Sequence, residues 1–411
     1  MIAQVTPSPL AGELDAVKSK SYAHRLLIAA ALSGGELSFG DSEDAFFTAH
    51  ALASLGFEAS FEGERVKFGD FHLPEGKQEI KVGESGSTLR FLVPLAAALG
   101  VSAEFVMAGR LASRPMGALA ECLAAHGAHW DGKALSGRLS SGIYEIDATI
   151  SSQFVTGLLM ALPLLQGDSE IRLLGRAVSA PYIEITLEVL ASFGIEIART
   201  ESGFLVKGGQ RYQRREAVVP GDFSGAAFFL AAGALGEGVT LRGLDKKNAQ
   251  GDKAILAILA RAGATVAIRK EEIFVSGGAL SAFRTNIGET PDLAPILAVV
   301  AAYARGTSRL ECVSRLRDKE SDRLAAIRDM LKRAGISSRE EGDDLVIEGG
   351  EPQGAAFDSF SDHRMAMSEA ILAAYAEGES RINDMACVKK SYPRFWEDFA
   401  RLGGRYEVER G

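Results

Sequence analysis

The stretch FSGAAFFLAAGAL, residues 223–235, contains no charged side chain and is followed by Gly236. Its apolar residues would cover every side of a helix, which is typical of a helix buried in a protein core. Similar segments, opened by small polar or charged residues and closed by glycine, lie at 21–33, 86–99, 152–166, 292–305 and 362–377. With 223–235 included, successive starts differ by 65, 66, 71, 69 and 70 residues. The chain therefore reads as six copies of one repeat.

A second helix in each repeat ends at a glycine, which is a C-cap signal when it follows the last apolar residue. These glycines are Gly56, Gly127, Gly194, Gly263, Gly335 and Gly403. Alternation of apolar and polar residues then predicts a strand, as in 265–269, and usually a hairpin. The repeat is helix, strand, helix, hairpin over about 68 residues. Common solenoid repeats have roughly 20 to 50 residues, so six longer repeats indicate two lobes of three.

The two lobes are expected to differ in how the chain runs through them. The sixth repeat ends near Val408, after one strand of its hairpin, and a strand-like segment, 1–7, precedes the first helix. We therefore expect lobe one to be discontinuous, with residues 1–17 and 221–411, and lobe two to contain residues 18–220. Two short crossings of this kind suit hinge closure around a ligand, so the active site is expected in the cleft between the lobes.

Composition excludes several classes of function. The 411 residues include 45 Lys and Arg against 54 Asp and Glu, a net charge of -9, which argues against a general nucleic-acid binder. Three widely spaced cysteines argue against a disulfide framework or a zinc site and fit a reducing compartment. The apolar runs are shorter than the roughly 18 to 20 residues of a membrane span. With no signal-peptide pattern at its start, the chain is expected to be a cytoplasmic protein that binds no membrane.

The starts of the six apolar helices carry the unusual chemistry. Ser, Thr and Asp there are explained most simply as N-caps. Capping does not explain Lys20, Arg25, Arg90 and Arg364, because the helix dipole disfavours a cation in the first turn. Residues that break a local rule are candidate functional residues. Several helix N-termini and cations facing one cleft predict a site for a small polyanion.

Further basic runs lie at matching loop positions of the repeats, in 109–115, 315–323 and 388–393. Charge runs are usually solvated surface, but their matching positions favour a shared site. The sequence has no GxxxxGK[ST] loop and no GxGxxG between a strand and a helix, so it does not support nucleotide binding through those motifs. A GxSxG nucleophile motif is absent too.

With these residues in view, the chain resembles the 5-enolpyruvylshikimate-3-phosphate synthases, a family of enolpyruvyl transferases. The resemblance covers essentially the whole length. It rests on KSYAHR (20–25), GESGSTLR (83–90), Arg110 with Arg114-Pro115, SSQ (151–153), PYI (181–183), Pro291-Asp292, KESDR (319–323), DHRMAM (362–367) and Lys390. It implies an α/β fold in which each lobe has three βαβαββ repeats, the inside-out α/β barrel of the enolpyruvyl transferases.

The resemblance also implies the reaction. The family transfers the enolpyruvyl group of phosphoenolpyruvate to the 5-hydroxyl of shikimate 3-phosphate and releases phosphate, by addition and then elimination. This step belongs to the shikimate pathway, the route to chorismate and the aromatic amino acids. It uses no cofactor and no metal, and glyphosate is the family's inhibitor at the phosphoenolpyruvate site. The two substrates are the only expected partners, and a monomer is expected.

The same resemblance implies three overlapping sets of site residues. The catalytic set is Lys20, Asp292, Glu320 and His363. The set for shikimate 3-phosphate is Lys20, Ser21, Arg25, Ser151, Ser152, Gln153, Ser179, Tyr182, Asp292, Arg315 and Lys319. The set for phosphoenolpyruvate is Lys20, Gly86, Arg110, Gln153, Arg323, Arg364 and Lys390.

Within the catalytic set, Asp292 would take the proton of the attacking hydroxyl. Lys20 and Glu320 would transfer protons at the methylene carbon, with His363 nearby. A base and an acid of this kind each contribute roughly 10²- to 10⁴-fold to a rate. The commonest family residues are not those found here at Glu84, Ser85 and Arg315, which leaves details of substrate contacts and glyphosate sensitivity open.

Two alternatives remain open at this stage. The related UDP-N-acetylglucosamine enolpyruvyl transferases usually carry a reactive cysteine before the Arg-Pro of the second repeat, and residues 105–115 contain none. A non-catalytic anion-binding relative would need neither an acid nor a base, whereas Lys20, Asp292 and Glu320 are all present.

Overall fold

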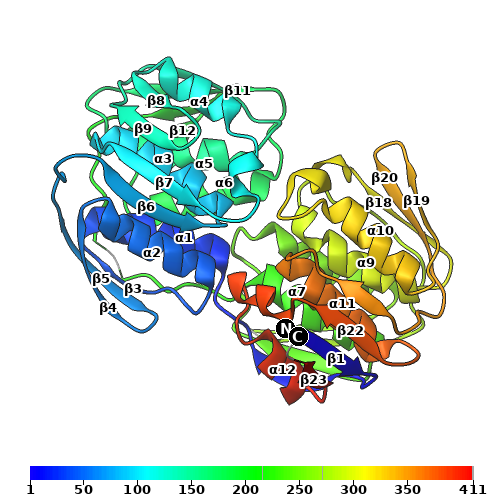
Figure 1. Ribbon diagram of the computed structural model, residues 1–411. Coiled ribbons are helices and arrows are strands. Elements are labelled where there is room, and N and C mark those ends of the chain that lie inside the picture. Colours follow the sequence, from blue (N-terminus) through cyan, green and yellow to red (C-terminus); the bar gives the residue numbers. More distant parts are fainter. Residues whose placement is uncertain (215, 271, 410–411) are drawn as a thin grey trace. The chain divides into compact units, whose positions relative to one another are not determined.

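The computed structural model describes residues 1–214, 216–270 and 272–409. The chain forms two compact units, Met1–Ser19 with Pro220–Gly411, and Lys20–Val219. We call them lobe one and lobe two and describe each by itself (Figure 1). Lobe one joins its two segments through a bridge between Lys18 and Gly221 and through a hydrogen bond from the Ser19 amide to the Pro220 carbonyl, 2.8 Å.

Lobe two contains three repeats, each with its own sheet. The first has α1 (Lys20–Ser33), β3 (Glu36–Ser38), α2 (Glu43–Ser54), β4 (Phe57–Glu62) and β5 (Arg65–Phe71), with sheet order β3-β5-β4. The second has β6 (Gln78–Gly83), α3 (Gly86–Leu99), β7 (Ala103–Met107), α4 (Gly117–Ala124), β8 (Ala128–Trp130) and β9 (Ala134–Gly137), with order β6-β7-β9-β8. The third has β10 (Ile143–Asp147), α5 (Ser152–Ala161), β11 (Ser169–Leu174), α6 (Ala180–Ser192), β12 (Ile197–Arg199) and β13 (Gly203–Val206), with order β10-β11-β13-β12.

Lobe one repeats the plan. Its first sheet, β15-β16-β14-β2, goes with β2 (Ala11–Asp15), α7 (Phe223–Leu235), β14 (Gly238–Arg242), α8 (Ala254–Ala262), β15 (Thr265–Arg269) and β16 (Glu272–Ser276). The next, β17-β18-β20-β19, goes with β17 (Arg284–Asn286), α9 (Ala294–Tyr303), β18 (Thr307–Glu311), α10 (Arg323–Arg333), β19 (Ser338–Glu341) and β20 (Asp344–Glu348). The last, β21-β22-β1-β23, goes with β21 (Ala356–Asp358), α11 (His363–Tyr375), β22 (Ser380–Asn383), α12 (Phe395–Arg401), β23 (Arg405–Glu409) and β1 (Ile2–Thr6).

The N-terminal strand completes the sixth repeat, as the sequence predicts. Strand β1 is antiparallel to both β22 and β23, with Ala3 opposite Ile382 on one side and Val408 on the other. Where a repeat begins with a strand, that strand pairs in parallel with the strand after the first helix, as β10 pairs with β11. The two hairpin strands then add to the sheet in antiparallel fashion, as β13 and β12 do. Among the described strands the six sheets are separate and none closes on itself.

The first helix of each repeat forms the core, as its composition predicts. In α7 every residue from Phe223 to Ala234 is buried, and α3, α9 and α11 are buried on nearly all sides. Helices α7, α9 and α11 pack on one another in lobe one, and α3 packs on α5 in lobe two. The polar first turns of these helices are therefore fixed by a rigid core. No helix in the described part of the chain is both long and apolar enough to cross a membrane.

Candidate functional site

Three helix starts meet in lobe one. Asp222 caps α7 by accepting a hydrogen bond from the Ser224 amide, 3.1 Å, and Asp362 caps α11 through the Arg364 amide, 3.0 Å. The 3-10 turn η4 (Pro291–Leu293) leads into α9 and presents Asp292. The capping expected of these aspartates is thus present at α7 and α11, whereas Asp292 makes contacts of another kind.

The guanidinium of Arg323 connects these starts. It has no exposed side-chain surface and lies at the start of α10. Its Nε donates to Asp362 at 2.7 Å, its Nη1 to Asp292 at 2.9 Å and its Nη2 to Glu320 at 2.6 Å. A guanidinium engaged by three carboxylates is rigidly positioned, because each charge-assisted hydrogen bond restrains it. In this structure the protein's own carboxylates therefore occupy the donors of a residue predicted to bind phosphoenolpyruvate.

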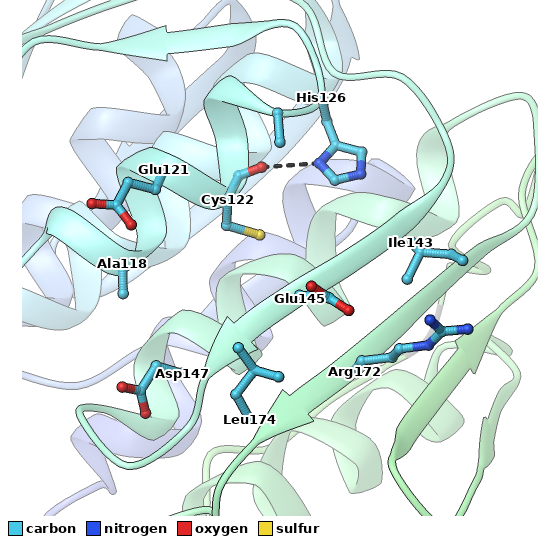
Figure 2. A pocket seen from close by; sticks show the side chains of 10 residues that line it. Ala118, Glu121, Cys122, His126, Ile143, Glu145, Asp147, Arg172 and Leu174 are labelled. Atoms are coloured by element: carbon cyan, nitrogen blue, oxygen red, sulfur yellow. Dashed lines mark hydrogen bonds between the residues drawn. The ribbon is translucent and has the colours of Figure 1, made fainter.

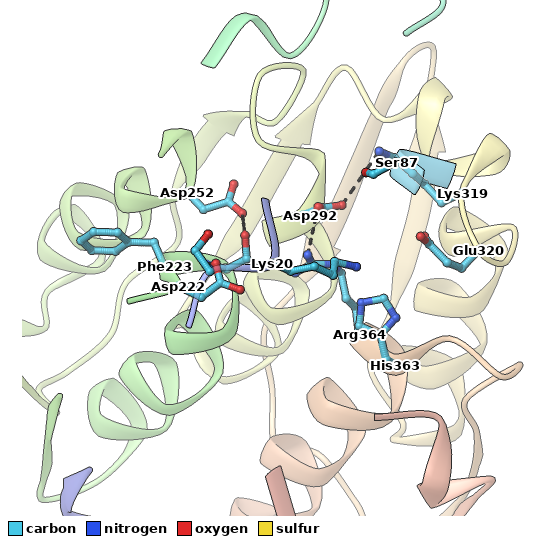
Figure 3. Close-up of polar contacts among 12 residues, drawn as sticks. Lys20, Ser87, Asp222, Phe223, Asp252, Asp292, Lys319, Glu320, His363 and Arg364 are labelled. Carbon is cyan, nitrogen blue, oxygen red and sulfur yellow. Dashed lines mark hydrogen bonds and ion pairs between the residues drawn. The ribbon is translucent and has the colours of Figure 1, made fainter. Parts of the chain in front are cut away.

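The carboxylate of Asp292 is surrounded by cationic side chains of lobe one (Figure 3). Besides Arg323, it accepts from Arg364 Nη2 at 3.0 Å, and Lys319 Nζ lies 3.9 Å from its Oδ1. Burial alone would raise its pKa, but the three cations outweigh burial and hold the pKa well below its usual range. Asp292 is therefore ionised, and it is a weak base for as long as the cations face it.

Lys319 lies among these groups with a perturbed pKa. Its side chain is 18% exposed. Burial lowers its pKa to about 8; the charges of Arg323 and Arg315 also lower it, and Asp292 acts in the opposite sense. A lysine whose pKa lies near neutrality can exchange a proton as well as bind an anion.

The other predicted residues of lobe one lie at the same helix starts or on the turns beside them. Arg315 is half-buried on the turn η5 (Ser314–Asp318), and Lys390 is buried at the end of the turn η6 (Met385–Lys390). His363 opens α11 and is 1% exposed, with Nδ1 3.9 Å from Asp362 Oδ1. His363 is thus buried at the start of α11, as Arg323 is at the start of α10, and its place in the catalytic set stays a prediction.

In lobe two, Lys20 and its partner define the start of α1. Lys20 Nζ donates to Asp44 Oδ2 at 2.8 Å, and the two side chains are 15% and 6% exposed. Asp44 lies on α2 and is not among the residues predicted from the sequence. Acidic residues in the first turn of a helix are common, so nothing in the pattern of residues singled it out.

The starts of α3 and α5 are tied together by one amide side chain. Gln153 Nε2 donates to the Ser87 hydroxyl at 2.9 Å, and Gln153 Oε1 accepts from Arg90 Nη1 at 2.6 Å. Arg90 also donates to the Pro115 carbonyl at 2.9 Å and packs over the ring of Phe154. The cation in the first turn of α3 is therefore explained: it fixes the orientation of Gln153, which is predicted to bind both substrates.

Arg114, not Arg110, lies against Gly86. A Cβ atom added to Gly86 would be 2.7 Å from Arg114 Nη1, so the guanidinium rests on the start of α3. Arg110 is exposed, and its carbonyl accepts a hydrogen bond from Ser113. Both arginines belong to the same loop, and a role of Arg110 at phosphoenolpyruvate stays a prediction. A helix N-terminus with a guanidinium beside it is an anion site, which points to Arg114.

Arg25 connects α1 to α6 through hydrogen bonds. It is 2% exposed and donates through Nε to Thr186, through Nη1 to the Ser21 carbonyl and through Nη2 to the Tyr182 carbonyl. Burial lowers its pKa to about 10. Arg25 therefore brings two predicted site residues, Ser21 and Tyr182, together through their main chains.

Besides Ser21, three predicted serines of lobe two lie at helix starts. Ser151 accepts from the Gln153 amide at 3.3 Å and caps α5, and Ser152 is buried at its first position. Ser179 precedes α6 with φ of 53°, a left-handed conformation that is strained for a residue other than glycine. Such strain is found at functional sites more than elsewhere, which fits a binding role for Ser179.

Lobe two also contains a pocket (Figure 2). Its volume is about 500 Å³, and Glu121, Cys122 and Glu145 line it between α4 and strands β10 and β11. None of its lining residues is a predicted site residue. The described residues contain no group of three or more His, Cys, Asp or Glu side chains that could hold a metal ion.

Known proteins resemble this chain along its whole length. A family model described as EPSP synthase (3-phosphoshikimate 1-carboxyvinyltransferase) matches residues 5–399. The 3-phosphoshikimate 1-carboxyvinyltransferase of Clostridium kluyveri is 39% identical over 416 residues, covering 98% of this chain and 97% of that protein. That of Clostridium perfringens is 38% identical over 414 residues, covering 97% and 98%.

Solved structures show the same fold. An EPSP synthase from Acinetobacter baumannii matches with a TM-score of 0.83 and 24% identity, covering 100% of both chains. The enolpyruvyl transferase NikO from Streptomyces tendae matches with a TM-score of 0.79 and 16% identity, covering 99% of this chain and 98% of that chain. The predicted α/β fold of the enolpyruvyl transferases is thereby confirmed.

Proposed function

The chain belongs to the EPSP synthase family, and from this premise we propose how its residues carry out the family's reaction. It transfers the enolpyruvyl group of phosphoenolpyruvate to the 5-hydroxyl of shikimate 3-phosphate and releases phosphate. It is thus a transferase of the shikimate pathway. Each step of this chemistry has particular side chains that suit it.

The first task is to bring two anions together. Phosphoenolpyruvate and shikimate 3-phosphate repel each other, so their approach requires fixed cations. In lobe one Arg323, Arg364 and Lys319 are gathered around Asp292. We propose that the carboxylate and phosphate of phosphoenolpyruvate take over part of these contacts, with Lys390 as a further cation.

When the cations exchange Asp292 for substrate anions, Asp292 would also become the catalytic base. When the cations turn toward substrate anions, Asp292 loses the charges that depress its pKa and becomes more basic. Asp292 would then take the 5-hydroxyl proton while the oxygen bonds to C2 of phosphoenolpyruvate. Lys20 or Glu320 would protonate the methylene carbon, which becomes a methyl group. The same residue, now a base, would take a proton from this methyl group while the C2–O bond to the phosphoryl group breaks, so that the enol ether forms and phosphate leaves.

Lobe two would supply most of the contacts to shikimate 3-phosphate. The residues proposed there are Ser21, Arg25, Ser151, Ser152, Gln153, Ser179 and Tyr182, with Arg315 and Lys319 from lobe one. The helix start at Gly86, with Arg114 beside it, would receive phosphoenolpyruvate together with Lys20, Gln153 and Arg110. Each substrate is thus proposed to draw its contacts from residues of both lobes.

The observation that carries this proposal is the carboxylate of Asp292 held by three cations. An anion-binding relative without activity gains nothing from a carboxylate that competes with its ligand, whereas a transferase needs a base there. UDP-N-acetylglucosamine as the acceptor is disfavoured by the match of the EPSP synthase family to residues 5–399 and by the absence of cysteine in residues 105–115.

The direct test is phosphate release from phosphoenolpyruvate by the purified protein, with and without shikimate 3-phosphate. Release that depends on shikimate 3-phosphate supports the assignment. Tight binding of both substrates without release would favour a non-catalytic relative, and release only with UDP-N-acetylglucosamine would favour the other acceptor. The monomeric state and cytoplasmic location stay predictions; sedimentation of the same sample tests the first.

A further inference from the structure

A buried carboxyl group outside the predicted sets, that of Asp252, lies near enough to Asp292 in lobe one for their charges to interact. Asp252 belongs to the 3-10 turn η3 (Gly251–Lys253) and is 3% exposed. The turn is pinned by its neighbour Gln250, whose side chain donates to the Gly221 carbonyl at 2.8 Å and accepts from the Phe223 amide at 2.9 Å. Asp252 therefore has little freedom to leave its position.

The two carboxyl oxygens of Asp252 have different surroundings. The hydroxyl of Ser224 donates to Oδ2, whereas the buried Oδ1 has no hydrogen-bond partner among the described residues. An ionised carboxylate with an unsatisfied oxygen in the interior is costly, and protonation removes most of that cost. The geometry thus favours the neutral form of Asp252.

On balance, the charged groups that face Asp252 also favour its neutral form. They are Asp292 on η4, Asp222 before α7 and Arg364 on α11. Burial, and next the charge of Asp292, raise the pKa of Asp252 to about 7, although Arg364 opposes them. Asp292 has the direct contacts to the cations and stays ionised, so the pair divides into one anion and one acid. Figure 3 shows both side chains among the helix starts.

We propose that Asp252 is a positioning residue that holds a proton next to Asp292 in the free protein, and that phosphoenolpyruvate binding strengthens its hold on this proton. The inference rests on the proposed function, because it assumes that anions bind to Arg364. A neutral Asp252 leaves the cations to Asp292 and to the substrate. Once ionised, it would repel the substrate anion and compete for Arg364.

The consequence is a linkage between pH and substrate binding. A substrate anion favours the protonated acid, so binding should weaken as pH rises through the range in which Asp252 ionises. The test measures the KM for phosphoenolpyruvate from pH 5.5 to 9, at saturating shikimate 3-phosphate, in the wild type and in Asp252→Asn. Asparagine is isosteric and neutral and keeps an oxygen for Ser224.

We expect the two proteins to have similar KM values at pH 5.5. At pH 8.5 to 9 the wild type should have a KM about threefold to tenfold higher than Asp252→Asn, a ratio of the size expected for a group that shifts by up to one pKa unit. Ser224→Ala removes a hydrogen bond that lowers the pKa of Asp252, so its rise in KM should move to higher pH. Asp245→Asn, an exposed aspartate of the same lobe, should behave as the wild type.

Identical pH profiles of KM in the wild type and Asp252→Asn would overturn the inference. If the wild type shows no phosphate release dependent on shikimate 3-phosphate, the proposed function fails, and thermal unfolding still decides whether Asp252 holds a proton. Its raised pKa means that the wild type should lose stability relative to Asp252→Asn as pH rises from about 4 to about 7. A stability difference that is constant with pH would overturn this part as well.

Discussion

At the scale of single residues, two arginines of one loop can be told apart. Arg114 rests on the start of α3 at Gly86, whereas Arg110 is exposed. Loss of a charged hydrogen-bond donor costs about 1.5 to 3 kcal/mol, so Arg114→Gln should raise the KM for phosphoenolpyruvate about tenfold or more. Arg110→Gln should change it less than threefold. Steady-state kinetics of the two variants measure this, and the opposite ranking would return the role to Arg110.

Glu369 provides a prediction about stability. It lies on α11, is 1% exposed, and neither carboxyl oxygen has a partner among the described residues. Burial, and then the charges of Asp358 and Asp329, raise its pKa well above its usual value. The folded protein therefore binds this proton more tightly than the unfolded chain, and stability from this group falls as pH rises above about 4.5.

Replacing the acid by a neutral amide tests this argument. Glu369→Gln should match the wild type at pH 4 and become more stable with rising pH, by about 1 to 3 kcal/mol at pH 8. Thermal unfolding across this pH range measures the difference. Glu397→Gln, an exposed glutamate of the same lobe, is the control. A stability difference that does not grow with pH would show that Glu369 has a partner or is ionised.

Sequence motifs place several residues among the expected site residues, and their roles stay predictions. Asp292, Arg323 and Arg364 were selected from the sequence, and the structure brings all three together. Asp44 and Asp252 were not selected, because their roles depend on burial and on a partner distant in the chain. Neither property can be seen in a run of letters, since an aspartate in the first turn of a helix usually serves the helix dipole.

At the scale of elements, Arg90 fixes the first turn of α3 to that of α5. It is 4% exposed and holds Gln153 and the Pro115 carbonyl. Arg90→Lys keeps the charge but cannot make both contacts, so Gln153 should lose its fixed orientation. We expect a KM for phosphoenolpyruvate about 5 to 20 times higher, with unchanged helix content by circular dichroism. Arg138→Lys, an exposed change in the same lobe, should be neutral, and equal kinetics of both variants would contradict this role.

Elements were predicted from two signals, apolar helices and glycine stops, and these are strong because the core helices are buried all round. The strand β2 carries no such signal. Only Leu14 of its five residues is buried, and it contains Gly12 and two acidic residues, so there is no alternation to detect. Its place beside β14 is set by tertiary pairing in a parallel register.

At the scale of the whole molecule, lobe one depends on both ends of the chain. Strand β1 lies inside the sheet β21-β22-β1-β23, where Val5 is fully buried opposite Ser380 and Tyr406. Val5→Asp places an unpaired charge there, which should cost about 3 kcal/mol or more of folding free energy. Because Lys20–Val219 forms a unit of its own, the damage should be confined to lobe one.

Hydrogen exchange can locate that damage. In Val5→Asp, amide protection should fall both in residues 2–6 and in residues 356–409, which are far apart in sequence but share one sheet of lobe one, and lobe two should keep its protection. Val408→Asp, on the neighbouring strand but 47% exposed, should change stability by less than about 0.5 kcal/mol. Equal loss of protection in residues 20–219 would mean that the two lobes unfold as one cooperative unit. In that case the division into two lobes, which the contacts show, would not separate two independently unfolding units.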